Sequence, residues 1–261
     1  MLLVIDMGNT AITMALMKSR DEICAVERVS TKQCLAHQDA VANRYVADAF
    51  DILLKKSHVQ AEDVTGVMVS SVVPHLTSWL CDVAGELTNS VPLTVDCEKK
   101  LNITLGYETV SQLGHDLITV SVASVHDYEG PIAVFDMGTA TTCSVIDADA
   151  CYRGTIIIPG LMISKDALIA QAAQLFDVAL EPHPPLIGVN TVQAMQSGFI
   201  NGTAAMIDGL ILRLKEELGA PVTVLLTGGA ASFIAPLCRQ QVIYDENLLL
   251  KGLWDIYLMN C

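Results

Sequence analysis

One short sequence occurs twice in this chain, and the repetition restricts what the chain can fold into. Residues 4–10 read VIDMGNT, and residues 134–142 read VFDMGTATT. In both copies an apolar run typical of a buried strand ends in Asp-Met-Gly and continues into small polar residues typical of a turn. The same strand and turn, made twice about 130 residues apart, predict two similar halves within one chain.

The composition excludes several classes of protein. Of the 261 residues, 52% are hydrophobic and 17% are charged, so the chain can build a core and disorder is not expected. The opening residues MLLVID carry no basic segment, and no run approaches the roughly 18 apolar residues of a membrane span. We therefore expect neither a signal peptide nor a membrane span, and a cytoplasmic location.

The net charge of the chain limits the classes of binding partner. A net charge of −14 repels phosphate backbones, so we expect no nucleic-acid partner. An anionic substrate would then need metal ions, helix N-termini or a few placed cations.

The eight cysteines form no CxxC pair and lie at no zinc spacing with the six histidines, which favours reduced thiols.

Strand patterns alternate with helix patterns along the chain. Apolar residues at helical spacing predict helices over residues 36–58, 75–87, 111–128, 164–176, 191–218 and 248–259, with apolar strands between them. This alternation is typical of an α/β fold in which mixed sheets are flanked by helices.

The Asp-x-Gly turns carry chemistry as well as structure. A carboxylate at the end of a strand, followed by glycine, can hold a hydrated divalent cation while the bare backbone approaches a phosphate. A single Asp-x-Gly is more often only a turn. Two copies in matching contexts favour function, because Asp6 and Asp136 both end buried strands, where an unpaired carboxylate is costly.

A third element, LTGGAA at residues 226–231, follows a buried strand. Gly228 and Gly229 would leave a flat backbone against which a planar ring could lie, although a simple turn explains them equally well. Together the two loops and this ledge suggest one nucleotide held in a cleft between two halves. The arrangement resembles the actin, sugar-kinase and Hsp70 ATPase superfamily, which implies two similar ribonuclease H-like domains, each a mixed sheet flanked by helices.

Within that superfamily the sequence resembles the type III pantothenate kinases over nearly its whole length. The resemblance rests on the order and spacing of several motifs rather than on any one of them. These are DMGNT at 6–10, SSVVP at 70–74, GYETVSQLGHD at 106–116, DMGTATT at 136–142, the IIIPG…S…AL run that ends at residue 168, GVNTVQAMQSG at 188–198, LTGGAA, and the ending NLLLKGLWDIY.

The resemblance implies a role for individual residues. Asp6 would lie near Mg²⁺, Asp136 would hold a monovalent cation, K⁺ or NH₄⁺, and Asp116 would be the general base. Nucleotide contacts would come from Asp6, Met7, Gly8, Asn9, Thr10, Ala11, Ile12 and Thr13, from Thr139, and from Gly228 and Gly229. Substrate contacts would come from Tyr107, Gly114, His115, Asp116, Leu117 and Thr191.

The resemblance also implies an organisation and an activity. Residues 1–112 would form an N-terminal ATPase-like domain, and residues 113–261 a C-terminal one that carries the dimer helices around 164–218. The expected activity is ATP-dependent phosphorylation of pantothenate, the first step of coenzyme A biosynthesis, by a homodimer.

The chain departs from the family pattern around the predicted substrate side. Leu117 stands where the family usually has an arginine that would hold the substrate carboxylate, and Ser144 stands where an aspartate is common. Arg153-Gly154 replaces a usual Gly-Gly, and LFDVAL at 175–180 lacks a usual Leu-Pro pair.

Three readings stay open at this point. In the first, Arg153 or His115 replaces the missing cation and the kinase is active. In the second, the chain binds a nucleotide without catalysis, as a regulatory accessory factor. In the third, it phosphorylates another small hydroxylated acceptor. A dinucleotide-dependent dehydrogenase is disfavoured, because no GxGxxG follows the first strand.

Overall fold

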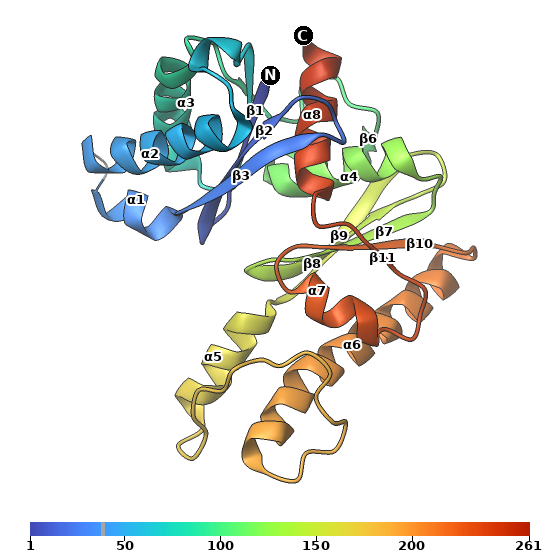
Figure 1. The fold of residues 1–261 in the computed structure, drawn as a ribbon. Coiled ribbons are helices and arrows are strands. Elements are labelled where there is room, and N and C mark those ends of the chain that lie inside the picture. The colour runs from blue at the N-terminus through green and yellow to red at the C-terminus, as the bar shows by residue number, and fades with distance from the viewer. Residues whose placement is uncertain (38–39) are drawn as a thin grey trace. The chain divides into compact units, whose positions relative to one another are not determined.

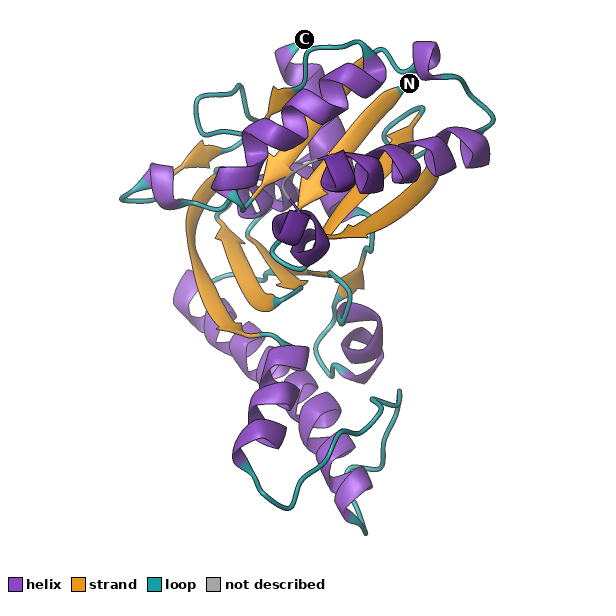
Figure 2. Cartoon of the chain, turned by 90° about the vertical axis from the view of Figure 1, so that its left-hand side faces the viewer, coloured by secondary structure: helices purple, strands orange, loops and turns teal. Residues whose placement is uncertain are grey.

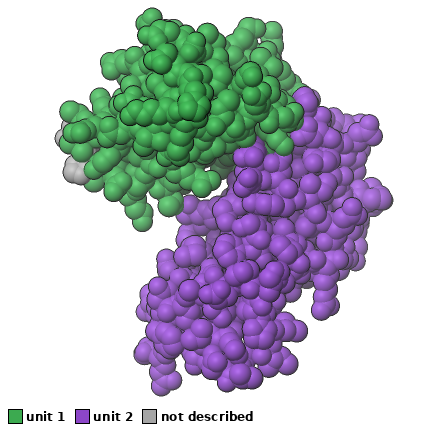
Figure 3. Space-filling view, in the orientation of Figure 1, with its two compact units in different colours: residues 1–102, 108–123, 248–261 green, residues 103–107, 124–247 purple. Residues whose placement is uncertain are grey.

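The computed structural model describes residues 1–37 and 40–261, which divide into two compact units. Unit 1 comprises residues 1–102, 108–123 and 248–261, and unit 2 comprises residues 103–107 and 124–247 (Figure 3). Each unit is therefore assembled from separate stretches of the chain. The sequence analysis expected a single domain boundary between residues 112 and 113, and this boundary stays a prediction.

Unit 1 is built on a five-stranded sheet in the order β3-β2-β1-β4-β5 (Figure 1). The central strand β1 pairs antiparallel with β2 and parallel with β4. The strands are β1 (Leu2–Met7), β2 (Ala11–Met17), β3 (Ile23–Ser30), β4 (Gly66–Ser71) and β5 (Leu93–Thr94). The sheet is mixed because the first three strands form a meander, whereas β4 returns after helices.

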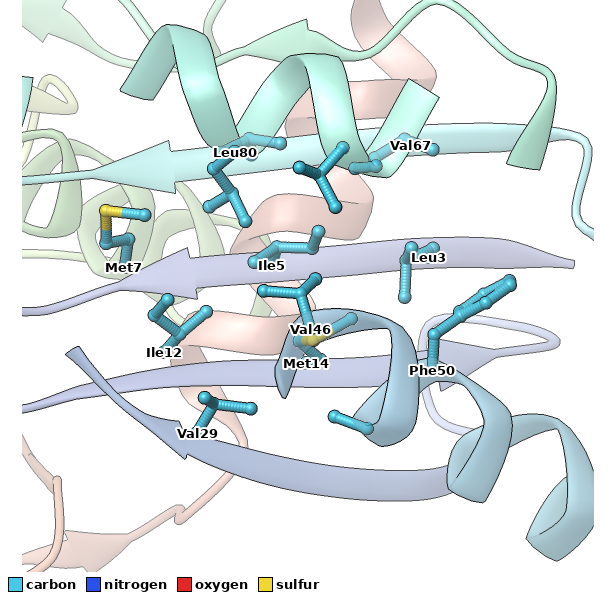
Figure 4. Close-up of a cluster of buried hydrophobic side chains, with 14 of the residues drawn as sticks. Leu3, Ile5, Met7, Ile12, Met14, Val29, Val46, Phe50, Val67 and Leu80 are labelled. Carbon is cyan, nitrogen blue, oxygen red and sulfur yellow. The ribbon is translucent and has the colours of Figure 1, made fainter. Parts of the chain in front are cut away.

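Helices cover both faces of this sheet. On one face, α2 and α3 pack Val46, Phe50 and Leu80 onto Leu3 and Ile5 of β1 (Figure 4). The other face carries α8, since a Cβ on Gly66 of β4 would overlap the hydroxyl of Tyr257 in α8. The helices are α1 (Thr31–His37), α2 (Ala40–Ser57), α3 (Pro74–Thr88) and α8 (Leu248–Asn260), with a 3₁₀ turn at Ala61–Asp63.

The helix α4 (His115–Asp127) begins in unit 1 and packs against α8. The contact is close, because a Cβ on Gly252 of α8 would overlap the carbonyl oxygen of Thr119. A 3₁₀ turn at Val110–Gln112 precedes α4. The start of α4 therefore lies on the α8 side of the sheet.

Unit 2 is built on a six-stranded sheet in the order β11-β10-β7-β8-β9-β6. Its strands are β6 (Thr104–Leu105), β7 (Ile132–Met137), β8 (Ala140–Ile146), β9 (Cys151–Pro159), β10 (Thr223–Thr227) and β11 (Ile243–Tyr244). One face packs Ala133, Phe135 and Met137 against the helices α5 (Leu161–Gln171), α6 (Thr191–Leu218) and α7 (Ala231–Ile234), the last followed by a 3₁₀ turn at Ala235–Leu237. Figure 2 shows the strands and helices of the chain by colour.

The structure confirms the predicted duplication of the α/β unit. Five strands have the same order and directions in both sheets, with β6 added at one edge of the second. β1 and β7 share one burial pattern along their length, and β2 and β8 share another. The register shifts at the same place in both copies, at Leu16/Met17 and at Val145/Ile146. Shared register and bulges indicate one strand pattern used twice.

The predicted helices mostly lie where the sequence placed them, but several of their first or last residues differ in the structure. The helix predicted over 191–218 is confirmed; Asn190 Oδ1 accepts from the N–H of Gln193 at its start, and Gly219 ends it at φ 63°. The helix predicted over 111–128 begins only at His115, after the 3₁₀ turn. The helix predicted over 164–176 spans Leu161–Gln171, and that predicted over 36–58 runs across residues 38–39, which lie outside the described chain.

The described helices include none that is both long enough and apolar enough to cross a membrane.

A buried ion pair fastens α8 to the rest of unit 1. Arg20 Nε, in the turn after β2, lies 2.9 Å from both carboxylate oxygens of Asp255. The two side chains are only 13% and 7% exposed. Arg20 also donates to the carbonyl oxygen of Ala123 in α4, at 3.5 Å. This one guanidinium therefore connects the sheet to both helices on its α8 side.

We expect Arg20→Ala to lower the free energy of unfolding by about 3–5 kcal/mol, because it removes one member of a buried ion pair. Urea denaturation measures the change. Lys18→Ala is the matched control, since Lys18 pairs with Glu22 in the same turn but both side chains are more than half exposed, and its loss should cost less than about 1 kcal/mol. Equal losses in the two variants would contradict the prediction.

Candidate active site

The first Asp-x-Gly loop connects β1 to β2 in unit 1. The N–H of Gly8 donates to the carbonyl oxygen of Ala11 at 3.0 Å, which closes the turn. Thr31, the first residue of α1, fixes the loop from the side: its Oγ1 donates to the Gly8 carbonyl at 2.8 Å, and its N–H donates to the Thr10 carbonyl at 3.1 Å. Asn9 and Thr10 are exposed at the tip. The loop is thus a fixed backbone turn that could receive a phosphate group.

The second loop, between β7 and β8 in unit 2, has the same form. Gly138 and Thr139 are exposed at its tip, and Asp136 lies at the end of β7 as Asp6 does at the end of β1. A Cβ on Gly160, just before α5, would overlap the carbonyl oxygen of Thr139. Only glycine fits there, so Gly160 determines how closely the start of α5 approaches the loop.

The predicted Gly-Gly ledge lies directly against the second loop. Gly228 has φ 88°, a conformation that favours glycine. A Cβ on it would lie 2.5 Å from Asp136 Oδ1 and 2.7 Å from the backbone nitrogen of Met137. The N–H of Ala230 donates to the Met137 carbonyl at 3.2 Å. The structure therefore brings Asp136 and Gly228 together within unit 2, with Gly229 exposed beside them.

Asp116 lies in the first turn of α4, in unit 1. Burial raises the pKa of its carboxyl above the ordinary value, although the N–H of Leu117 donates to Oδ1 at 2.9 Å and the nearby His115 acts in the opposite direction. The carboxylate lies over Gly114, where a Cβ would overlap Oδ1. A carboxylate with a raised pKa is a better proton acceptor near neutral pH than an exposed one.

The other predicted substrate residues fall in unit 2. Tyr107 packs edge-to-face on the buried Tyr152, with ring centroids 6.1 Å apart. Thr191, exposed at the first turn of α6, lines a mostly apolar cavity of about 720 Å³ beside α5. Tyr107 is not among the residues that line this cavity. Gly114, His115, Asp116 and Leu117 come together at the start of α4, whereas Tyr107 and Thr191 belong to the other unit.

The donor set fits a metal ion that arrives with a nucleotide. Within the described chain, no three His, Cys, Asp or Glu side chains are grouped to hold a metal by themselves. Each loop instead offers one carboxylate, and beside Asp6 the buried hydroxyl of Ser70 has no hydrogen-bond partner among the described residues. Mg²⁺ keeps several waters and takes phosphate oxygens, so one carboxylate suffices.

Comparison with known proteins decides the family. The sequence model of the type III pantothenate kinase family matches residues 2–213. The chain belongs to the type III pantothenate kinase family. A type III pantothenate kinase of Exiguobacterium sp. is 38% identical over 264 residues, covering 100% of this chain and 99% of the relative. That of Thermomicrobium roseum is 35% identical over 257 residues, covering 98% and 96%.

Solved structures confirm the fold. A Campylobacter jejuni protein, named as a candidate Baf family transcriptional activator, matches with a TM-score of 0.60 at 20% identity, over 98% of this chain and 97% of that one. A glucomannokinase from Arthrobacter sp. strain KM matches with a TM-score of 0.50 at 14% identity, over 98% of both chains. At such identities the likeness concerns the fold alone.

The structure locates the residues at which this chain departs from the type III pantothenate kinase pattern. Leu117 is 7% exposed, so its apolar side chain lies in the core and supplies no positive charge beside Asp116. Arg153 is engaged elsewhere in unit 2, because its Nη1 lies 3.2 Å from Asp147 Oδ2. His115 is adjacent to Asp116 and partly exposed. Of the two cations considered as replacements, His115 therefore has the closer connection to the predicted base.

The sequence analysis assigned no role to three residues that lie against the two Asp-x-Gly loops. Thr31 ties down the first loop, Gly160 packs against the second, and Ser70 lies beside Asp6. Only Ser70 had a signal, the polar end of an otherwise apolar strand. The other two act through contacts between segments distant in sequence.

We expect Asp116→Asn to unfold at a higher temperature than the wild type at pH 7. The raised pKa means that folding disfavours the ionised carboxylate, so ionised Asp116 destabilises the native state above that pKa. The advantage of the variant should shrink as the pH falls through the raised pKa, where the wild type becomes neutral. Thermal unfolding from pH 4 to 8 measures this, with Asp149→Asn, at an exposed position, as control. A variant less stable at pH 7 would contradict the assignment.

Proposed function

We propose that this chain transfers the γ-phosphoryl group of ATP to the primary hydroxyl of pantothenate, the first step of coenzyme A biosynthesis. The observation that carries the proposal is Asp116, a carboxylate with a raised pKa at the start of α4, in a member of the type III pantothenate kinase family. The duplicated strands that end near Asp6 and Asp136, each followed by a tight turn, support it.

The nucleotide would be bound mainly by backbone groups and single carboxylates. Phosphoryl transfer requires positioning and charge neutralisation more than covalent chemistry from the protein. Neither loop contains a lysine or arginine, so Mg²⁺ bound with ATP, together with K⁺ or NH₄⁺, would offset the triphosphate charge. Asp6 would hold the divalent cation through its water shell, and Asp136 the monovalent one.

Asp116 would act on the acceptor. Its Oδ atom accepts the proton of the pantothenate hydroxyl as the hydroxyl oxygen attacks the γ-phosphorus, and the proton remains on the carboxyl group as ADP leaves. Gly114 allows the carboxylate to turn back over the backbone, and the Leu117 N–H holds one oxygen. A further lone pair of the carboxylate would accept the hydroxyl proton.

The proposed assembly is a cytoplasmic homodimer. Unit 2 exposes several large apolar side chains on α5 and just before α6. Monomeric proteins rarely expose so many of them close together. The side chains are Met162, Ile163, Leu168, Leu186, Ile187 and Val189, between 43% and 86% exposed. Covering them with the same face of a second copy would remove this surface from water, in the region predicted to carry the dimer helices.

Family membership favours the kinase over a nucleotide-binding accessory factor. The relatives from Exiguobacterium sp. and Thermomicrobium roseum, which match 98–100% of this chain, are both named as type III pantothenate kinases. The structure named for transcriptional activation is only 20% identical and bears on the fold alone.

We expect pantothenate-dependent release of ADP from the purified protein with ATP and Mg²⁺, and stimulation of this release by K⁺ or NH₄⁺. Asp116→Asn should lower kcat by roughly 10²–10⁴-fold, because it removes the general base. A coupled assay for ADP measures both effects. Asp149→Asn, which changes an exposed carboxylate, should keep the wild-type rate.

Folded wild-type protein that binds ATP but releases no ADP at high pantothenate would overturn the kinase. A panel of other small hydroxylated acceptors would then identify or exclude a changed substrate. Full activity in Asp116→Asn would overturn only the assignment of the base.

The substrate carboxylate needs a cation, and two variants distinguish the candidates. We expect His115→Ala to raise KM for pantothenate about tenfold or more, which corresponds to the loss of roughly 1.5 kcal/mol from a hydrogen bond to a charged group. Arg153→Ala should leave KM unchanged, because its guanidinium already pairs with Asp147. The reverse pattern in steady-state kinetics would assign the role to Arg153.

A further inference from the structure

We propose that Ser70 is a positioning residue that donates a hydrogen bond to the Asp6 carboxylate when a divalent cation and nucleotide phosphates bind at the first loop. This inference rests on the proposed function for the identity of the ligand. It assigns a task to a side chain outside both Asp-x-Gly loops.

The register of the sheet puts the two residues side by side. Asp6 of β1 is paired with Ser70 of β4 in parallel strands. Side chains alternate along a strand, so Gly66 and Ser70 share one face, and the contact of Gly66 with Tyr257 shows that this is the α8 face. Paired neighbours on adjacent strands lie roughly 5 Å apart, a gap that a serine hydroxyl and an aspartate carboxylate can span.

The hydroxyl of Ser70 is buried without a partner. Ser70 is fully buried, and among the described residues its Oγ makes no hydrogen bond. The adjacent Ser71 differs: its Oγ accepts from the N–H of Val73 at 3.1 Å and from Thr77 Oγ1 at 2.8 Å. Buried polar groups are nearly always paired, so an orphan beside a candidate site calls for an explanation. A bond that forms only in the bound state provides one.

The second unit repeats the arrangement. Asp136 of β7 is paired with Thr227 of β10, which is 2% exposed. β4 reads GVMVSS and β10 reads TVLLT, so these strands share little beyond apolar residues and a hydroxyl at this register. On the antiparallel side, Asp6 faces Thr13 and Asp136 faces Thr142. Each carboxylate thus lies between two hydroxyl residues on the neighbouring strands. Packing alone would not require this arrangement in both units.

The proposed action is orientation. A serine hydroxyl donates one hydrogen bond and rotates to suit its acceptor. Donation to one Asp6 oxygen fixes the plane of the carboxylate and leaves its other oxygen toward the hydrated cation. Partners of this kind, which orient the groups at a metal site, typically change metal affinity by roughly 10–100-fold when removed.

The test is the binding of a non-hydrolysable ATP analogue, adenylyl imidodiphosphate, measured by calorimetry with and without Mg²⁺. Ser70→Ala should weaken binding at least about tenfold in Mg²⁺ and change it little without Mg²⁺. Its melting temperature without ligand should equal or exceed that of the wild type, because an unpaired buried hydroxyl is removed. Ser70→Cys should behave as Ser70→Ala, since a thiol is a weak donor, and Ser70→Thr, which copies Thr227, should restore Mg²⁺-dependent binding.

Ser71→Ala is the matched control. It removes a hydroxyl that accepts two hydrogen bonds within unit 1, so it should lower the melting temperature and leave the affinity of the folded protein unchanged. Wild-type affinity in Ser70→Ala with Mg²⁺ would overturn the proposal.

A separate assay of pantothenate turnover distinguishes a failure of the Ser70 proposal from a failure of the proposed kinase function. Wild-type turnover of pantothenate with no effect of Ser70→Ala on binding would overturn the role of Ser70 and leave the kinase intact. Mg²⁺-dependent binding that is lost in Ser70→Ala, without turnover of pantothenate, would support Ser70 and overturn the acceptor. A wild-type protein that binds no Mg²⁺-nucleotide would overturn both.

Discussion

The pairing of two parallel strands, made once in each unit, is the constraint on which the rest of the structure depends. β1 with β4 and β7 with β10 place an aspartate beside a hydroxyl residue at the same register. A slip of one residue would turn the carboxylate of Asp6 toward the apolar face packed by α2 and α3, where its charge would be uncompensated. The register that the core specifies is therefore the register that arranges the candidate site.

The repeated strand and turn could be predicted because their signals are local. An apolar run that ends in Asp-Met-Gly, followed by a second run with alternating burial, describes a strand, a tight turn and a returning strand without knowledge of the rest of the chain. The helix over residues 191–218 was equally visible, since Asn190 and Gly219 mark its two ends. The α/β class followed from these elements, and the family followed from the order of the motifs.

The remaining features depend on contacts between distant segments, which no local pattern encodes. The pairing of Asp6 with Ser70 joins residues 64 positions apart, and the sequence alone does not fix that register. The start of α4 was predicted too early, because residues 110–112 form a separate 3₁₀ turn before the helix begins at His115. The sequence left Arg153 as one candidate to replace the missing arginine, but in the structure Arg153 pairs with Asp147. The raised pKa of Asp116 likewise reflects burial, which only the fold determines.

The place of α8 in unit 1 has a consequence for synthesis. The chain is made from its N-terminus, yet the helix that covers the Asp6 face of the first sheet leaves the ribosome only after all of unit 2. At roughly 5–20 residues per second, several seconds or more separate the completion of β5 from the arrival of α8. All of unit 2 can fold in that interval, while the face of the first sheet that α8 covers remains exposed. A chain that terminated at residue 247 would thus lack the closing layer of its first domain, and not merely a tail.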